Sequence, residues 1–115
     1  SKTRKEGERL MNFTSFLQDR QLTVALTGEI DHQCAREYIA KIREKIDTYL
    51  PAVCVLDFRD VSFMDSSGIA VVINALRQMN GVGGKLRLEG LGSQPMRVLL
   101  TAGIEKIVEI REAVR

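Results

Sequence analysis

The residues best suited to chemistry are an acid, two hydroxyls and a glycine in succession, Asp65-Ser66-Ser67-Gly68. They follow an apolar run and precede an amphipathic one, so we expect them where a strand turns into a helix. The first turn of a helix leaves backbone N–H groups without intrahelical partners, and such groups attract negative charge. The sequence therefore predicts a corner that holds or receives an anion and carries the hydroxyls of Ser66 and Ser67.

Helix capping alone also explains these residues. With Asp65 as the N-cap, Ser66 takes the first helical position, and Met64 and Ile69 have the spacing of a hydrophobic staple. Asp-Ser-Ser-Gly by itself is a weak motif, because acids and hydroxyls are common at helix starts in proteins of every function. The corner residues alone do not decide between a cap and a functional site.

A hydrolase is a second hypothesis, because His32 could lie at the same edge of the sheet as Ser66. A nucleophilic serine needs a positioned base, and the Gly-x-Ser-x-Gly elbow of hydrolases does not precede the predicted helix. His32 directly follows Asp31, a typical capping residue, which favours a histidine on a helix surface. We expect no ester turnover by this pair and classify the protein as a non-enzyme.

No metal or cofactor is predicted. Cys34 and Cys54 form no Cys-x-x-Cys or Cys/His cluster, and His32 is the single histidine, so a zinc site is hard to build. Two such cysteines are typical of buried thiols in a reducing compartment. The glycine-rich run 81–84 follows a predicted helix and leads into a predicted strand, the reverse of the order in a nucleotide-binding loop. We interpret it as a turn.

The composition is that of an ordinary globular protein. The chain has 115 residues, 44% hydrophobic and 28% charged, which suits one domain with one core. Its net charge of +2 gives no signature of nucleic-acid or membrane binding. No segment reaches the roughly 20 apolar residues of a membrane helix and no signal peptide is recognised, so we expect a cytoplasmic protein. Residues 1–10, which are mostly charged, are expected to be a flexible lead-in to a domain at 11–115.

Hydrophobic periodicity predicts the elements that position the corner. Apolar positions recur every 3.6 residues after Asp31, with Tyr49 and Leu50 on the inner face, and again after Ser93, with Met96, Leu99 and Leu100 facing inward. In the first half of the chain we expect strands at 12–17 and 21–27 around a turn at 18–20, a helix from 32 to 50 capped by Asp31, and a buried strand at 52–58. In the second half we expect a helix from the corner to 79, a strand at 85–89 and a short helix capped by Ser93. A strand at 107–110 and a helical turn from 111 complete the predicted elements.

The order β-β-α-β-α-β-α-β predicts a single α/β domain, in which helices pack against a mixed, mostly parallel sheet of about five strands. A right-handed crossover makes the strands on either side of a helix parallel. The loops that follow these parallel strands therefore leave from one edge of the sheet, where α/β proteins usually bind ligands and partners. Residues 28–33, 60–67 and 90–94 are predicted to form one surface.

Two stretches together resemble a known family. Leu26-Thr-Gly-Glu-Ile-Asp-His32 and Val61-Ser-Phe-Met-Asp-Ser-Ser-Gly-Ile69 look like the paired signature of STAS domains, most closely the bacterial anti-sigma factor antagonists of the sporulation type. The similarity covers about residues 11–110 and includes the order of elements. In that family the first serine after the aspartate is phosphorylated by an anti-sigma factor that is also a serine kinase. The resemblance therefore implies that Ser66 is the phosphoacceptor.

The resemblance also implies a partner and a switch. Unphosphorylated protein would bind the anti-sigma factor and free a sigma factor, and phosphorylation would break that complex. The alternative that fits the same family is a STAS scaffold of a stress-signalling complex or an accessory module of a transporter. The residues assigned to partner binding are those at and around the phosphorylation site: Glu29, Asp31, His32, Asp65, Ser66, Ser67 and Gly68.

Electrostatics supports such a switch. A phosphate adds about −1.5 to −2 charges, and Asp65, with Asp31 and Glu29 nearby, makes the predicted surface acidic already. Burying that phosphate under a partner would be penalised without any refolding. The chain differs from the family pattern at its ends, where the basic lead-in is unusual and the closing helix is nearly absent. The sigma factor under control and the oligomeric state stay open, a weak homodimer included.

Overall fold

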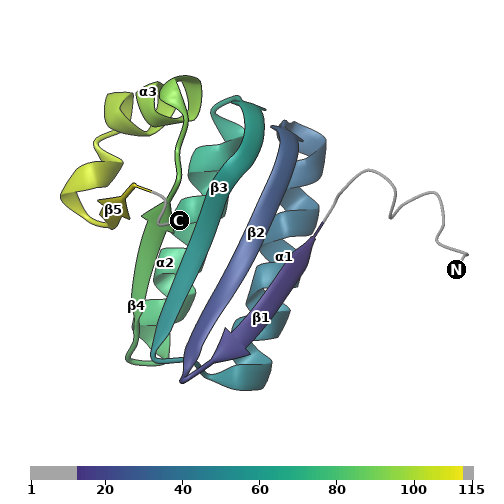
Figure 1. Ribbon diagram of the computed structural model, residues 1–115, viewed down its shortest axis with the longest axis vertical. Coiled ribbons are helices and arrows are strands. Elements are labelled where there is room, and N and C mark those ends of the chain that lie inside the picture. Colours follow the sequence, from purple (N-terminus) through teal and green to yellow (C-terminus); the bar gives the residue numbers. More distant parts are fainter. Residues whose placement is uncertain (1–12, 113–115) are drawn as a thin grey trace, which may run out of the picture.

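The computed structural model describes residues 13–112 (Figure 1). The predicted lead-in at 1–10 and Asn12 of the predicted first strand lie outside the described residues. The elements, in chain order, are β1 (Thr14–Gln18), β2 (Gln21–Ile30), α1 (His32–Tyr49), β3 (Val53–Met64), α2 (Ser67–Gly81), β4 (Lys85–Glu89), α3 (Ser93–Thr101), the 3₁₀ turn η2 (Ile104–Lys106) and β5 (Glu109–Arg111).

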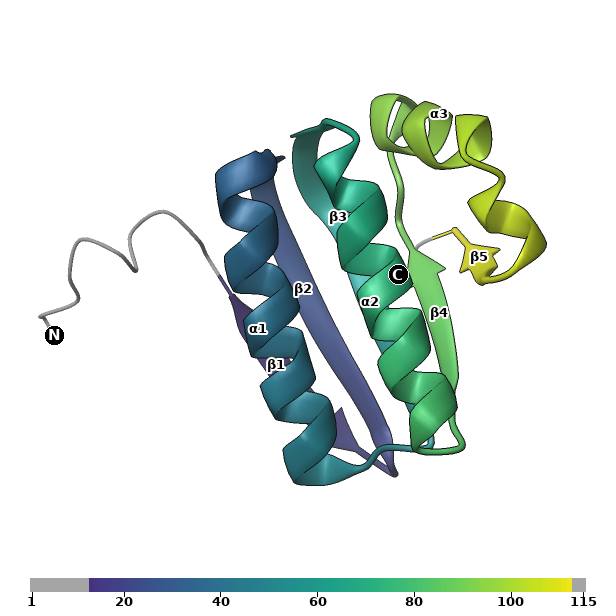
Figure 2. The same cartoon turned by 180° about the vertical axis from the view of Figure 1, so that it is seen from behind.

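The five strands form one sheet in the order β1-β2-β3-β4-β5. β1 pairs antiparallel with β2, and every other pair is parallel, which confirms the predicted mixed sheet. Figure 2 shows α1 and α2 side by side across one face, as right-handed crossovers require. Helix α3 lies beyond the carboxyl end of β4, at the same end of the sheet as the last residues of β2 and β3 (Figure 1). The carboxyl ends of the parallel strands thus meet α3 at one edge.

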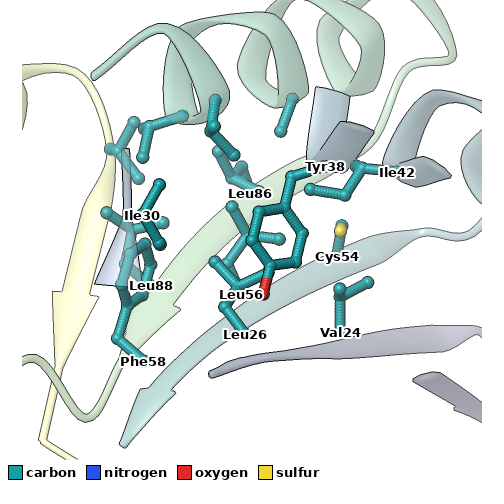
Figure 3. Packing of buried hydrophobic residues seen from close by; sticks show 14 of the residues in the cluster. Val24, Leu26, Ile30, Tyr38, Ile42, Cys54, Leu56, Phe58, Leu86 and Leu88 are labelled. Carbon is teal, nitrogen blue, oxygen red and sulfur yellow. The ribbon is translucent and has the colours of Figure 1, made fainter. Parts of the chain in front are cut away.

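The core lies between the sheet and the two long helices. Alternate residues of the strands face α1 and α2, because successive side chains of a strand point to opposite faces. Tyr38 of α1 is buried among them, and its hydroxyl group donates a hydrogen bond to the Thr27 carbonyl at 3.2 Å. Figure 3 shows this packing, which includes Val24, Leu26, Cys54, Leu56, Phe58, Leu86 and Leu88.

Two strands are longer than predicted. β2 continues past Thr27 to Ile30, and β3 continues past Phe58 to Met64, so most of the predicted loop 60–67 is strand. Two register shifts between β2 and β3, one of them at Gly28 with φ of 76°, allow the pairing to continue. Such irregularities interrupt the alternation of inward-facing and outward-facing side chains, which is the pattern used to predict a strand from sequence. The polar corner is therefore the direct end of a paired strand.

Several predicted ends were wrong for local reasons. Leu50 has the left-handed conformation with φ of 46°, which takes it off the helical face, and it is exposed, as is Tyr49 at the last position of α1. Leu100 is also exposed, because the short α3 buries Pro95 and Leu99 instead. The N-cap of α3 is Gly92 and not Ser93, which is its first residue.

The two smallest connections also differ from prediction. The first turn consists of two residues, Asp19 and Arg20, both with positive φ, as in the type I′ turns that suit a hairpin. Residues 104–106 form η2, which delays the last strand, so that Arg111 ends β5 and does not begin a helix. The rest of the predicted final turn, 113–115, lies outside the described residues. No helix within 13–112 is long and apolar enough to span a membrane.

Candidate functional site

The carboxyl ends of β2 and β3 lie side by side and bring two predicted segments together. Ile30 pairs with Met64, and the Asp65 N–H donates a hydrogen bond to the Ile30 carbonyl at 3.1 Å. Asp31 and Asp65 therefore follow directly on two paired residues. The structure thus joins the predicted segments 28–33 and 60–67 into one edge, which we call the corner surface: Glu29, Asp31, His32, Asp65, Ser66 and Ser67.

The N-cap position of helix α2 is Ser66, one residue later than predicted, but the capping contact comes from Asp65. Its carboxylate accepts a hydrogen bond from the Ser67 N–H at 2.7 Å, and its carbonyl accepts one from the Gly68 N–H at 3.0 Å. The helix is assigned one residue later than predicted, from Ser67, although Ser66 already has helical backbone angles. The side chain of Ser66 is exposed and that of Ser67 is half-buried. Ser66 is therefore the more accessible hydroxyl on a backbone with fixed hydrogen bonds.

Gly68 has a packing role. It is buried, and a Cβ atom added there would lie 2.3 Å from both Cγ and Sδ of Met64. Met64 is itself fully buried, and Ile69 packs against the same core cluster. Among the residues assigned to partner binding, Gly68 thus contributes to the shape of the corner and offers no side chain to a partner.

Gln94, at the start of α3, contacts the corner; sequence analysis placed its segment 90–94 at this surface but did not single out this residue. Its side-chain oxygen accepts a hydrogen bond from the Met64 N–H at 2.9 Å, and its side-chain nitrogen donates one to the Met64 carbonyl at 2.8 Å. These contacts join residues that lie 30 positions apart in the chain. The predicted segment 90–94 therefore reaches the corner through one side chain. Only a signal of long-range contact could have identified it, since no local pattern specifies this pairing.

Asp31 is the N-cap of α1, and its carboxylate accepts a hydrogen bond from the Cys34 N–H at 3.0 Å. That backbone hydrogen bond holds the pKa of the Asp31 carboxyl below its ordinary value of 3.8. Asp31 itself is exposed, as are the neighbouring His32 and Glu29. All three side chains are therefore accessible to a partner.

The lowered pKa of Asp31 makes a prediction about acid stability. A carboxylate with a lowered folded-state pKa stabilises the protein above its unfolded-state pKa, and the contribution is lost as the pH falls through the folded-state value. Asn also caps helices but does not titrate. We expect the free energy of unfolding of wild type, relative to Asp31→Asn, to fall between about pH 6 and about pH 3 in urea titrations. Parallel curves for the two proteins would contradict this.

Phe63 is the second residue that sequence analysis missed. Strict alternation from the buried Val61 would turn Phe63 toward the core. The register shift opposite Gly28 and Glu29 interrupts the alternation, and Phe63 is 42% exposed where it pairs with Glu29. An accessible aromatic ring three residues before Ser66 is the kind of side chain that anchors protein partners.

The described residues place no base beside the hydroxyl group of Ser66. Among the described residues, no hydrogen bond joins His32 to Ser66, so the dyad of the hydrolase hypothesis is not formed. The Ser67 N–H at the helix start is already bonded to the Asp65 carboxylate. A phosphate on Ser66 would therefore meet a negative charge and not an empty anion site.

The chain is similar to STAS domains and to anti-sigma factor antagonists. The sequence model of the STAS domain matches residues 15–115. The anti-sigma F factor antagonist of Paenibacillus polymyxa is 30% identical over 89 residues, which cover 77% of this chain and 76% of that protein. The anti-sigma-B factor antagonist of Bacillus subtilis (strain 168) is 30% identical over 95 residues, which cover 80% and 83%. Among solved structures, the anti-sigma factor antagonist SpoIIAA in its unphosphorylated form is similar with a TM-score of 0.79 and 26% identity, covering 90% of each chain.

Proposed function

The chain belongs to the STAS domain family, and we propose that it is an anti-sigma factor antagonist switched by phosphorylation. In this proposal it binds an anti-sigma factor that is also a serine kinase, and its binding releases a sigma factor. Phosphate transfer to Ser66 by the same partner then ends the complex. The protein acts in the cytoplasm and needs neither a metal nor a cofactor of its own for binding.

The observation that carries the proposal is the exposed hydroxyl of Ser66 at a rigid, acidic corner. Two curated relatives are named anti-sigma factor antagonists. The similar SpoIIAA structure is described as an unphosphorylated form, so phosphorylation distinguishes states of that relative. On this chain, Ser66 is the more exposed of the two corner serines and follows the capping Asp65. These points support Ser66 as the phosphoacceptor.

The corner surface and Phe63 are the proposed docking site. Glu29, Asp31 and Asp65 give it negative charge beside Ser66. A complementary partner surface would be rich in cationic or N–H donor groups, which steer association and fix orientation. Phe63 supplies an aromatic contact, and aromatic residues are enriched among the side chains that dominate binding energy. The proposed partner thus makes one apolar contact and several polar ones around the acceptor hydroxyl.

The direct test mixes the purified protein with its anti-sigma partner and ATP and locates phosphate by mass spectrometry. We expect one phosphate, on Ser66, and none on Ser66→Ala. Ser67→Ala is the matched control, because the same chemical change one residue later removes a half-buried hydroxyl and should leave phosphorylation intact.

The outcomes separate the proposal from its alternative. A STAS scaffold or transporter module would bind its partner without gaining phosphate, so binding with no modification would favour that function. Phosphate on Ser67, with Ser66→Ala still modified, would leave the switch in place but reassign its residue. Absence of both binding and phosphate would overturn the proposed function.

A further inference from the structure

We infer that Gln94 is a positioning residue for Ser66 and makes helix α3 part of the phosphorylation switch. This inference rests on the proposed function, since it concerns how the acceptor hydroxyl is presented to a kinase. Gln94 acts through the Met64 backbone, which it holds at 2.9 and 2.8 Å through both ends of its side-chain amide. Met64 stands two residues before Ser66.

The place of Gln94 in the sheet explains why these two hydrogen bonds matter. β4 pairs with β3 only as far as Asp57, which is opposite Glu89. Within the described residues, the remainder of β3 has no strand on its β4 side. The amide of Gln94 gives Met64 one acceptor and one donor, as a residue on a neighbouring strand would. Gln94 therefore replaces the missing strand at the last residue of β3.

The other side of the corner is held by β2. Ile30 is opposite Met64, and its carbonyl accepts a hydrogen bond from the Asp65 N–H. The backbone that leads into Ser66 is thus fixed between β2 and α3. Met64 also fills the space beside Gly68 at the start of α2. A shift of Met64 would therefore move both the strand and the helix that define the position of Ser66.

Only an uncharged amide supplies both hydrogen bonds in this orientation. Methionine has a similar length, but it cannot donate to the Met64 carbonyl, and its thioether sulfur is only a weak acceptor for the Met64 N–H. An ionised glutamate keeps the acceptor, loses the donor and places negative charge against the carbonyl oxygen. The two substitutions thus remove the same contact by different means, while keeping a side chain of comparable size.

The experiment compares Gln94→Met with Gln78→Met in phosphorylation by the anti-sigma kinase. Gln78 is a matched control, because it is also half-buried and its side chain also spans two elements, from α2 to Asp47 of α1. We expect Gln94→Met to lower kcat for phosphate transfer to Ser66 at least about tenfold, since misplacement of a reacting group is costly, with a smaller change in KM. Gln78→Met should leave kcat within about twofold.

A second variant and a second measurement keep the inference testable if Gln94→Met folds poorly. Gln94→Glu should show the same loss of kcat. In the free proteins, amide hydrogen exchange at Met64 should rise at least about tenfold in Gln94→Met, because its N–H loses an acceptor. Exchange at Leu88, in the centre of the core, should not change.

The results distinguish this inference from the proposed function. If wild type gains no phosphate, the proposed function fails, and the exchange measurement still decides whether Gln94 holds the corner. If wild type is phosphorylated and both Gln94 variants have wild-type kcat, the positioning role is overturned. An equal loss of kcat in Gln78→Met would show a general effect of stability and would also overturn it.

Discussion

Ser66→Asp should bind the anti-sigma partner more than about a hundredfold more weakly than wild type, whereas Ser66→Ala should bind with nearly wild-type affinity. A partner packed against Ser66 must desolvate any charge placed there, beside the carboxylates of Asp65 and Asp31. A penalty of only ~3 kcal/mol reduces affinity by more than about a hundredfold. Removal of a hydroxyl adds no charge and leaves the Asp65 cap of α2 in place.

The affinities are measured by titration calorimetry with the purified partner. Thr14→Asp is the control for net charge, because Thr14 is exposed on the edge strand β1. It adds the same charge away from the corner and should change affinity by less than about threefold. Unfolding curves should show that both Ser66 variants keep the wild-type fold. Equal affinity of Ser66→Asp and Ser66→Ala would contradict an electrostatic switch.

The proposed switch would need no conformational change, because the corner is held from several sides. The Asp65 N–H donates a hydrogen bond to the Ile30 carbonyl of β2, and the Met64 N–H donates one to the side-chain oxygen of Gln94 in α3. A phosphate on Ser66 would therefore alter the charge of a fixed surface. In this proposal, differential interaction with the partner would be the whole source of the change in affinity.

Local signals accounted for most of the fold. The Asp31 cap, the helical period and the order of elements depend on neighbours in the chain, and all were predicted correctly, as was the capping contact of Asp65 at the start of α2. The parallel sheet followed from crossover handedness, which is a general constraint. The serine corner was located by the same local pattern, although its assignment to phosphorylation came from family resemblance and stays a prediction.

The features that sequence analysis did not predict depend on contacts between segments that are distant in the chain. The true end of β3 depends on register shifts against β2, and these also bring Phe63 to the surface. Gln94 bonds to a residue 30 positions away, and a glutamine near a helix start carries no sign of that role. The sequence thus predicted which serine accepts phosphate, while the residues that hold the corner became visible only when three elements were placed together.

Gly68→Ala should destabilise the protein by about 1–2 kcal/mol, which is the cost of overpacking less the gain from alanine as the better helix former. The added Cβ would lie 2.3 Å from Cγ and Sδ of Met64. Met64 is fully buried and its backbone is bonded to Gln94, so its side chain has little room to move. The expected cost is that of overpacking a closed core, and it exceeds the gain in helix propensity of about 1 kcal/mol.

Gly81→Ala is the matched substitution, since Gly81 ends the same helix and a Cβ there meets no atom within 4 Å. It should be neutral or stabilising by up to about 1 kcal/mol, so the two variants should differ in sign in urea unfolding. If Gly68→Ala were as stable as Gly81→Ala, Met64 would be free to rearrange. The corner would then be more deformable than its hydrogen bonds indicate, and a switch based on a fixed surface would lose its structural basis.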